Sequence, residues 1–381
     1  MELLDYGTLR FIWWLIMVFL LVGFAIMDGH DMGIGSLLPF LGKTDEERRV
    51  IINTVSAHWE GNQVWFITAG GALFAAIPMV YATAFSGFYW AMMAVLWALF
   101  FRPVAFKYRS LMPEHKWRFA WDWGLFIGSF FPPILFGVAI GNVLLGVPFY
   151  LDGDLRSYYT GSFWALLNPF ALLCGLLSIT MIIFHGAVYL SHRTIGEIHN
   201  RCLPVIKISG LLTGILFALA GIWIAFGIKG YLITSAIDTA GASNPLNKTV
   251  ITETGAWLAN YRHYPLIITL PILAYLGIIG AWIFTNKGKT FIAFLCSSAT
   301  VLAIISTAGA SMFPFLLPSS TLPNTSLTIW DSTSGQHSLL VMLIASVILM
   351  PIVLIYTAWA FRIMRGKVTK EYIRENEHSA Y

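Results

Sequence analysis

The sequence predicts an all-α polytopic membrane protein, a single integral membrane domain that covers residues 1–381. Hydrophobic residues make up 57% of the chain and charged residues 11%, whereas a soluble domain carries about a quarter charged residues. Apolar runs recur from Phe11 to Phe361, and they lack the short alternating segments of a membrane β-barrel. The chain is therefore expected to cross the bilayer repeatedly as helices.

The apolar runs predict nine transmembrane helices, because each is roughly 20 to 28 residues long and the hydrocarbon core needs about 20. Pro78 separates the second run from the third, which predicts a tight helical hairpin. Pro132 and Pro133 lie near the middle of the fourth run and predict a kink there. The nine spans are expected at about 9–33, 51–77, 79–101, 119–145, 163–190, 205–228, 264–284, 291–317 and 338–361.

The connections between these spans differ in their content of Lys and Arg. Most of the 23 basic residues lie in the connections that follow odd-numbered spans, and basic loops stay on the cytoplasmic side. The sequence therefore predicts an external N-terminus and a cytoplasmic C-terminus, with longer outer loops at 146–162, 229–263 and 318–337. The basic residues are spread over several loops, so nucleic acid is not an expected partner. Three scattered cysteines define neither a disulfide framework nor a metal site.

Polar side chains gather in the half of the membrane that this topology makes cytoplasmic. Asp28 and Asp31 lie three residues apart near the inner end of the first span and share a helix face. Residues 56–65 of the second span carry four more polar groups, and such groups are expensive at membrane depth. His58 and Asn62 share one face of that helix, and Glu60 and Gln63 share a neighbouring one. Further polar groups on this side are Arg102, Asp122 and His185.

This bias to one side favours a half-channel for protons over a through-pathway for a solute. Glu60 is expected about nine residues, or ~13 Å, into the second helix. Desolvation disfavours the charged form of a carboxyl group at that depth, so Glu60 could take up and release a proton near neutral pH. A purely structural interpretation remains open. Helix-end ion pairs would account for Asp28, Asp31, Arg102 and Asp122, and buried hydrogen bonds would account for His58 and His185.

Two other classes of function are compatible with the polar residues. A secondary transporter would use Glu60 with Asp28 and Asp31, but transporters place polar groups near the midplane in both halves of the chain. A self-contained membrane cytochrome would need His58 and His185 to face each other across a haem, and nothing in their surroundings selects them. The residues alone therefore define a polytopic protein with a polar cluster on its cytoplasmic side.

Eight stretches share a recognisable pattern: LRFIWW at 9–14, DGHDMG at 28–33, HWEGNQVW at 58–65, FRP at 101–103, WDWG at 121–124, MFPF at 312–315, PSS at 318–320 and SLTIWD at 326–331. Together they resemble subunit II of the cytochrome bd quinol oxidases, nearly from end to end. Two positions depart from the family pattern. His30 stands where the family usually has an aromatic residue, and Glu60 stands where close relatives have Asp. The glutamate keeps the acid and lengthens its reach by one methylene, so a proton role survives.

The resemblance implies a heterodimeric terminal oxidase of the bacterial inner membrane, which oxidises quinol, reduces O2 to water and generates a proton motive force. It implies two four-helix bundles plus one peripheral helix. Subunit I would hold haem b and haem d, so this chain would contribute no catalytic residue and no metal ligand. Some members of the family hold a quinone in this subunit, and a small single-span accessory subunit binds mainly through subunit I.

The resemblance also implies roles for particular side chains. The acid at the position of Glu60 lies on a proton route from the cytoplasm toward the haem site. We group Asp28, Asp31 and His58 with Glu60 as the expected proton pathway. The expected supporting polar groups are Arg102, Asp122, Asn62 and Gln63.

Overall fold

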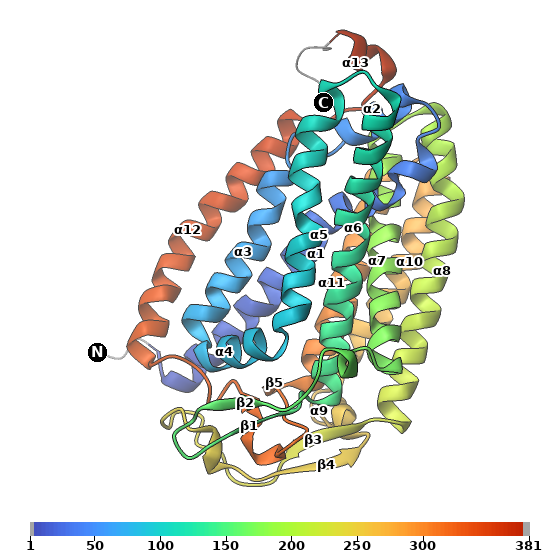
Figure 1. Ribbon diagram of the computed structural model, residues 1–381. Coiled ribbons are helices and arrows are strands. Elements are labelled where there is room, and N and C mark those ends of the chain that lie inside the picture. Colours follow the sequence, from blue (N-terminus) through green and yellow to red (C-terminus); the bar gives the residue numbers. More distant parts are fainter. Residues whose placement is uncertain (1–3, 376–381) are drawn as a thin grey trace.

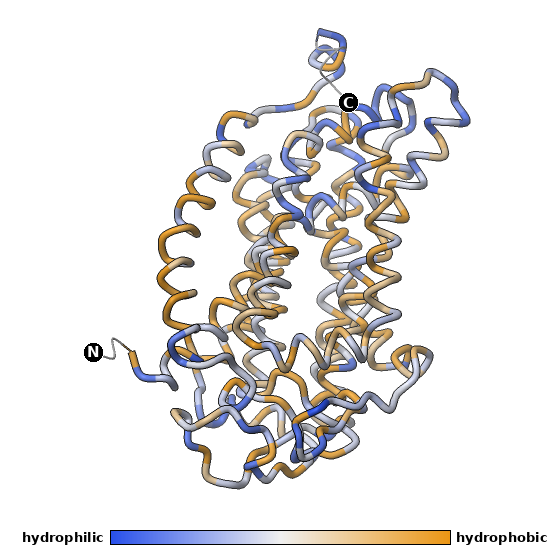
Figure 2. The backbone as a smooth tube through the Cα atoms, turned by 60° about the vertical axis from the view of Figure 1, so that its left-hand side comes forward, coloured by the Kyte–Doolittle hydropathy of each residue, from blue (hydrophilic) through white to orange (hydrophobic). Residues whose placement is uncertain are grey.

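The structure is a computed structural model that describes residues 4–375. Within them, eight helices are long and apolar enough to cross a membrane, and a ninth pass results if one bent helix pair is counted as a span. Figure 1 shows the long helices side by side, with short strands at one end and the helices α2 (Asp45–Asn53) and α13 (Lys370–Glu375) at the other. Figure 2 shows polar backbone concentrated toward these two ends, with mostly hydrophobic helices between them. The predicted all-helical membrane fold is confirmed.

The long helices form two groups of four with one helix outside. Helices α1, α3, α5 and α6 make the first group, and α7, α8, α10 and α11 make the second; α7 contacts both α1 and α6. Helix α12 lies on the outside against α1 and α3 and is mostly exposed. The bounds are α1 (Tyr6–Leu41), α3 (Trp59–Ala76), α4 (Pro78–Gly87), α5 (Tyr89–Tyr108), α6 (His115–Leu145), α7 (Pro169–Arg193), α8 (Gly196–Phe226), α9 (Ala259–His263), α10 (Thr269–Asn286), α11 (Thr290–Met312) and α12 (Gln336–Ile363).

The second predicted span, 51–77, is not one continuous helix. Helix α2 ends at Asn53, residues 54–58 form turns, and α3 begins at Trp59. The Thr54 hydroxyl donates to the carbonyl oxygen of Ile51 at 2.6 Å. Short polar side chains of this kind offer the backbone alternatives to helical hydrogen bonds. The polar stretch at 56–65 therefore straddles a break and the first turns of a new helix.

The predicted hairpin at Pro78 is also wrong. Pro78 opens the short helix α4, which is bent by 119° from α3. A proline fits the first position of a helix, while Ile77 before it has a non-helical backbone, as expected for a residue that precedes proline. The third long helix is consequently α5, which starts ten residues later than the predicted span 79–101.

The end opposite α2 is closed by three antiparallel hairpins. They lie in or beside the three predicted outer loops, and a backbone hydrogen bond of 2.8 Å from Val147 to Pro318 joins two of them. The predicted span 291–317 is too long, because α11 ends at Met312 and the chain then enters a strand. The strands are β1 (Phe149–Leu151), β2 (Ser157–Tyr159), β3 (Lys229–Ile233), β4 (Val250–Thr254), β5 (Phe315–Leu317) and β6 (Leu327–Thr328).

The crossing of α1 and α7 depends on two glycines. A Cβ atom added to Gly186 would lie 2.6 Å from Cα of Gly33, and one added to Gly33 would meet the carbonyl oxygen of Ile182. Both obstacles are backbone atoms, which cannot move aside as the end of a side chain can. These glycines therefore let the two helices touch along their backbones.

We expect Gly186→Ala to destabilise the protein by about 1–3 kcal/mol, because the added methyl group overpacks a backbone contact. The measurement is the thermal unfolding midpoint of the purified membrane complex. Gly221→Ala is the matched control, since nothing lies within 4 Å of a Cβ atom at that position in α8. Equal midpoints for the two variants would show that α1 and α7 are not in close contact.

Candidate functional site

A cluster of buried polar side chains lies between α1, α3, α5 and α7. Helix α1 continues beyond the predicted end at Gly33 as far as Leu41. Asp31 is therefore about ten residues, or ~15 Å, from the end of the helix. The sequence predicts Asp28 and Asp31 near the inner end of the first helix. The structure instead places both acids in the interior of that helix. The cluster consists of Asp28, His30, Asp31, His58, Asn62, Arg102, His185 and Tyr189.

Arg102 on α5 forms a two-pronged ion pair with Asp28 on α1. Its Nη1 and Nη2 atoms donate to Asp28 Oδ2 and Oδ1 at 2.8 and 2.6 Å, and both side chains are 0% exposed. The planar guanidinium matches the two carboxylate oxygens. Helix α6 leaves room for the pair at Gly128, where a Cβ atom would lie 2.9 Å from Arg102 Cγ. The sequence had left the partner of Arg102 open.

Asp31 is linked to α3 and α7 through a chain of hydrogen bonds. The Nδ2 amide group of Asn62 donates to Asp31 Oδ2 at 2.8 Å and also reaches His58 Nδ1 at 3.0 Å. Because an amide nitrogen only donates, His58 Nδ1 is an acceptor, and its Nε2–H then donates to the Tyr189 hydroxyl oxygen at 3.1 Å. The predicted shared face of His58 and Asn62 thus points into the cluster.

His30 and His185 share one carbonyl oxygen. Nδ1 of His30 and Nε2 of His185 lie 2.9 and 3.0 Å from the carbonyl oxygen of Ile26. A carbonyl oxygen only accepts, so each of these ring nitrogens carries a proton. The other nitrogen of His185 lies 2.9 Å from the Ser297 hydroxyl oxygen. His185 is therefore a buried, hydrogen-bonded histidine, as the structural interpretation expected.

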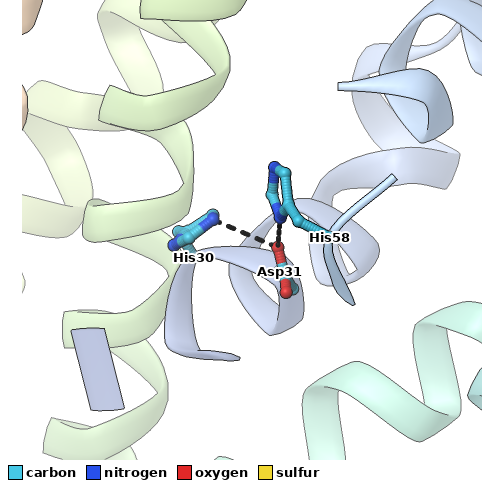
Figure 3. A group of neighbouring side chains, drawn as sticks. All are labelled: His30, Asp31 and His58. Atoms are coloured by element: carbon cyan, nitrogen blue, oxygen red, sulfur yellow. Dashed lines mark ion pairs between the residues drawn. The ribbon is translucent and has the colours of Figure 1, made fainter. Parts of the chain in front are cut away.

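The second nitrogen of His30 faces Asp31. Its Nε2 atom lies 3.2 Å from Asp31 Oδ1, and the Nδ1 atom of His58 lies 3.8 Å from the same oxygen. Figure 3 shows Asp31 between the two imidazole rings. The sequence marked His30 only as a departure from the family pattern, and it missed Tyr189. The spacing of four residues from His185 could have placed Tyr189 on the same face of α7.

Glu60 is not buried in this chain, contrary to the expected desolvated carboxyl group. It is the second residue of α3, its side chain is 64% exposed, and its Oε1 atom lies 3.6 Å from Nζ of Lys107. The nine helical residues that were expected before Glu60 are replaced by α2 and the turns at 54–58. Gln63 is half-buried on α3 and lies outside the hydrogen bonds that join the cluster.

Asp122 is separate from the cluster, contrary to its expected supporting role. Arg48 Nη1 and Arg109 Nε donate to its carboxylate oxygens at 2.8 and 2.5 Å near the start of α6. A second pair on this side joins Arg201 Nη1 to Glu47 Oε2 at 2.7 Å, and this hydrogen bond lowers the pKa of Glu47. Asp122 therefore links α6 to Arg48 of α2 and to Arg109 after α5, at the end of the bundle where α2 lies.

Three residues of the cluster carry atoms that could bind a metal ion. One potential ligand atom from each of His30, Asp31 and His58 lies within 4.8 Å of the others. Both ring nitrogens of His58 and of His185 are already engaged with protein groups, so neither histidine offers a free nitrogen to haem iron. His30 and Asp31 alone are fewer ligands than a zinc site uses. Within residues 4–375, these side chains do not fit a haem or a metal centre.

The membrane helices and their charge-paired interior define a multi-pass integral membrane protein. The family model for cytochrome bd terminal oxidase subunit II matches residues 9–364. This chain belongs to that family and is a subunit of an oxidoreductase complex, as the sequence predicted.

Individual relatives agree with this assignment. The chain is 55% identical over 379 residues to cytochrome bd-I ubiquinol oxidase subunit 2 of Escherichia coli strain K12, covering 100% of both chains. It is 47% identical over 379 residues to a probable cytochrome oxidase subunit 2 of Haemophilus influenzae, again covering 100% of both. The structure of bd oxidase from Geobacillus thermodenitrificans aligns with a TM-score of 0.69 at 15% identity, over 94% of this chain and 100% of that one, which shows a shared fold.

We expect Arg102→Met to destabilise the complex by about 3–5 kcal/mol, because it leaves the Asp28 carboxylate buried without its partner. The double variant Asp28→Leu with Arg102→Met should recover much of this loss, since it removes both charges. Thermal unfolding of the purified complex gives the comparison.

Arg374→Ala is the control for this experiment. It removes a pair with Glu46 in which the arginine side chain is 71% exposed, and an exposed pair contributes at most about 1 kcal/mol. A double variant as unstable as Arg102→Met alone would show that the Asp28 charge is not the source of the loss.

Proposed function

We propose that this chain is the scaffolding and proton-delivering subunit of a quinol oxidase that reduces O2 to water. The observation that carries the proposal is the inner end of α3. There, Glu60 is exposed on one face of the helix, while Asn62 on the opposite face and His58 just before the helix contact the buried Asp31. One short segment therefore joins the surface of the chain to its polar interior. The family and its ubiquinol oxidase member in Escherichia coli support the reaction.

The exposed face of α3 is the proposed contact with subunit I. Val64, Ile67 and Phe74 are 50%, 68% and 61% exposed, and their spacing places them on the same side of the helix as Glu60. Helix α3 also leaves open space at Gly61 and Gly71. A carboxylate that faced lipid beside this apolar stripe would be costly. If subunit I packs against this face of α3, the carboxylate no longer faces lipid. Glu60 then faces the subunit that reduces O2.

The haems are assigned to subunit I, because both ring nitrogens of His58 and of His185 contact protein groups. A quinone bound in this chain and a single-span accessory subunit on the complex are carried over from the family resemblance. We place the N-terminus outside and the C-terminus in the cytoplasm of a bacterium, in line with the positive-inside rule.

The proposed direction of proton uptake follows from the reaction. Reduction of O2 consumes protons, while oxidation of quinol releases them. If the consumed protons come from the cytoplasm and the others leave outside, the membrane becomes charged without a separate pump. The hairpins cover the outer end of the bundle, and Asp31 is hydrogen-bonded to Asn62 near the inner end of α3. This arrangement suits an uptake route from the cytoplasmic side only.

We expect Glu60→Gln to lower the turnover of the complex at least about tenfold, because proton transfer through a positioned acid is lost. Turnover is measured as quinol-dependent O2 consumption, and the haem spectrum should stay unchanged. Glu60→Asp should keep most of the activity, since it retains the acid.

Glu197→Gln is the matched control, because Glu197 is an exposed acid in the first turn of α8. It should have wild-type turnover. Wild-type turnover in Glu60→Gln as well would remove Glu60 from the proton route.

A further inference from the structure

We propose that Asp31 and His30 form a binding site for one proton, which Asp31 Oδ1 carries and donates to His30 Nε2. The site deepens the proposed uptake role, and its part in turnover rests on that role. The proton itself is inferred from three features of the resting structure: the hydrogen bonds around the pair, the charges around it and the absence of water-accessible surface.

The hydrogen bonds leave two acceptors facing each other. His30 uses its Nδ1–H group for the carbonyl oxygen of Ile26, so Nε2 of a neutral ring has only a lone pair. Asp31 Oδ1 has only lone pairs as well when the carboxyl group is ionised. The two atoms lie 3.2 Å apart, and in the described part of the chain neither has a hydrogen-bond partner. A single proton between them satisfies both.

The charges in the cluster also indicate that one proton is bound. Arg102 and Asp28 neutralise each other, the hydrogen bonds of His58 are those of a neutral ring, and the second nitrogen of His185 faces a hydroxyl group that can donate to it. Asp31 is then an unpaired carboxylate with 0% side-chain exposure, and an unpaired charge is strongly disfavoured in such an interior. One added proton makes the whole cluster neutral. The titratable and charged groups around the pair are Asp28 on α1, His58 just before α3, Arg102 on α5, and His185, Tyr189 and Arg193 on α7.

The packing keeps the pair away from water. The His30 ring lies 4.1 Å from the ring of Tyr189, measured between centroids, and the His58 ring stacks at 4.4 Å on Phe361 of α12. His30 and Asp31 are 0% and 1% exposed. The route that the structure offers to the proton is the Asn62 and His58 side of Asp31, next to the inner end of α3.

The test is infrared spectroscopy of the intact haem-bearing complex, recorded as a difference between neutral and alkaline pH. We expect a carboxylic-acid C=O band that shifts in deuterated buffer and is lost in Asp31→Asn. In His30→Phe the band should move or disappear, because the acid has lost its acceptor. His30→Gln, which restores an acceptor oxygen, should bring the band back toward its wild-type position.

Glu197→Gln should leave the band unchanged, and the haem spectrum reports whether each variant is assembled. If Asp31→Asn does not assemble, the two His30 variants carry the test. A wild-type band in all assembled variants of these two residues would overturn the proposal. So would carboxylate bands from Asp31 with an imidazolium signal from His30.

The spectrum is recorded at rest, so it separates this inference from the proposed function. A band assigned to Asp31 together with normal turnover in Glu60→Gln would keep the proton site and reject the uptake route. Slow turnover in Glu60→Gln without such a band would reject the proton site alone.

Discussion

The ion pair between Arg102 and Asp28 sets the charge balance of the buried polar cluster. A guanidinium and a carboxylate that are both fully buried are tolerated because each satisfies the other. Their mutual neutralisation leaves Asp31 as the group whose charge can change. The His58 ring accepts from an amide nitrogen and donates to a hydroxyl oxygen, which is the pattern of a neutral ring. A single protonation event can therefore be localised in a cluster that contains eight polar side chains.

The break before α3 connects this interior to the surface. An uninterrupted helix over residues 51–77 would place His58 and Glu60 about 160° apart around the helix axis, with both residues inside regular structure. The break instead ends α2 at Asn53 and turns the chain so that His58 precedes the first turn of the next helix. Glu60 is then free to face a partner while Asn62 holds Asp31. Within α3, Glu60 and Asn62 are two residues apart, so helix periodicity places them on nearly opposite faces.

The sequence predicted the class of fold and most of the polar groups, because long apolar runs and charges at membrane depth are visible without tertiary contacts. It did not predict the break at 54–58, since hydropathy does not register a Thr54 hydroxyl that bonds the backbone. Nor could it separate Asp122 from Asp28, because the partner of each acid comes from a distant helix. The sequence could not predict that the Glu60 side chain is exposed either. Periodicity shows which residues share a helix face but not what covers that face.

The central claim is that protons for O2 reduction enter from the cytoplasmic side through Glu60. The direct measurement is proton uptake, followed with a pH-sensitive dye on each side of vesicles that hold the oriented complex, as the reduced complex reacts with O2. The account predicts uptake on the cytoplasmic side, slowed at least about tenfold in Glu60→Gln while the haem spectrum is unchanged. Uptake from the outer side, or wild-type uptake in the variant, would contradict it.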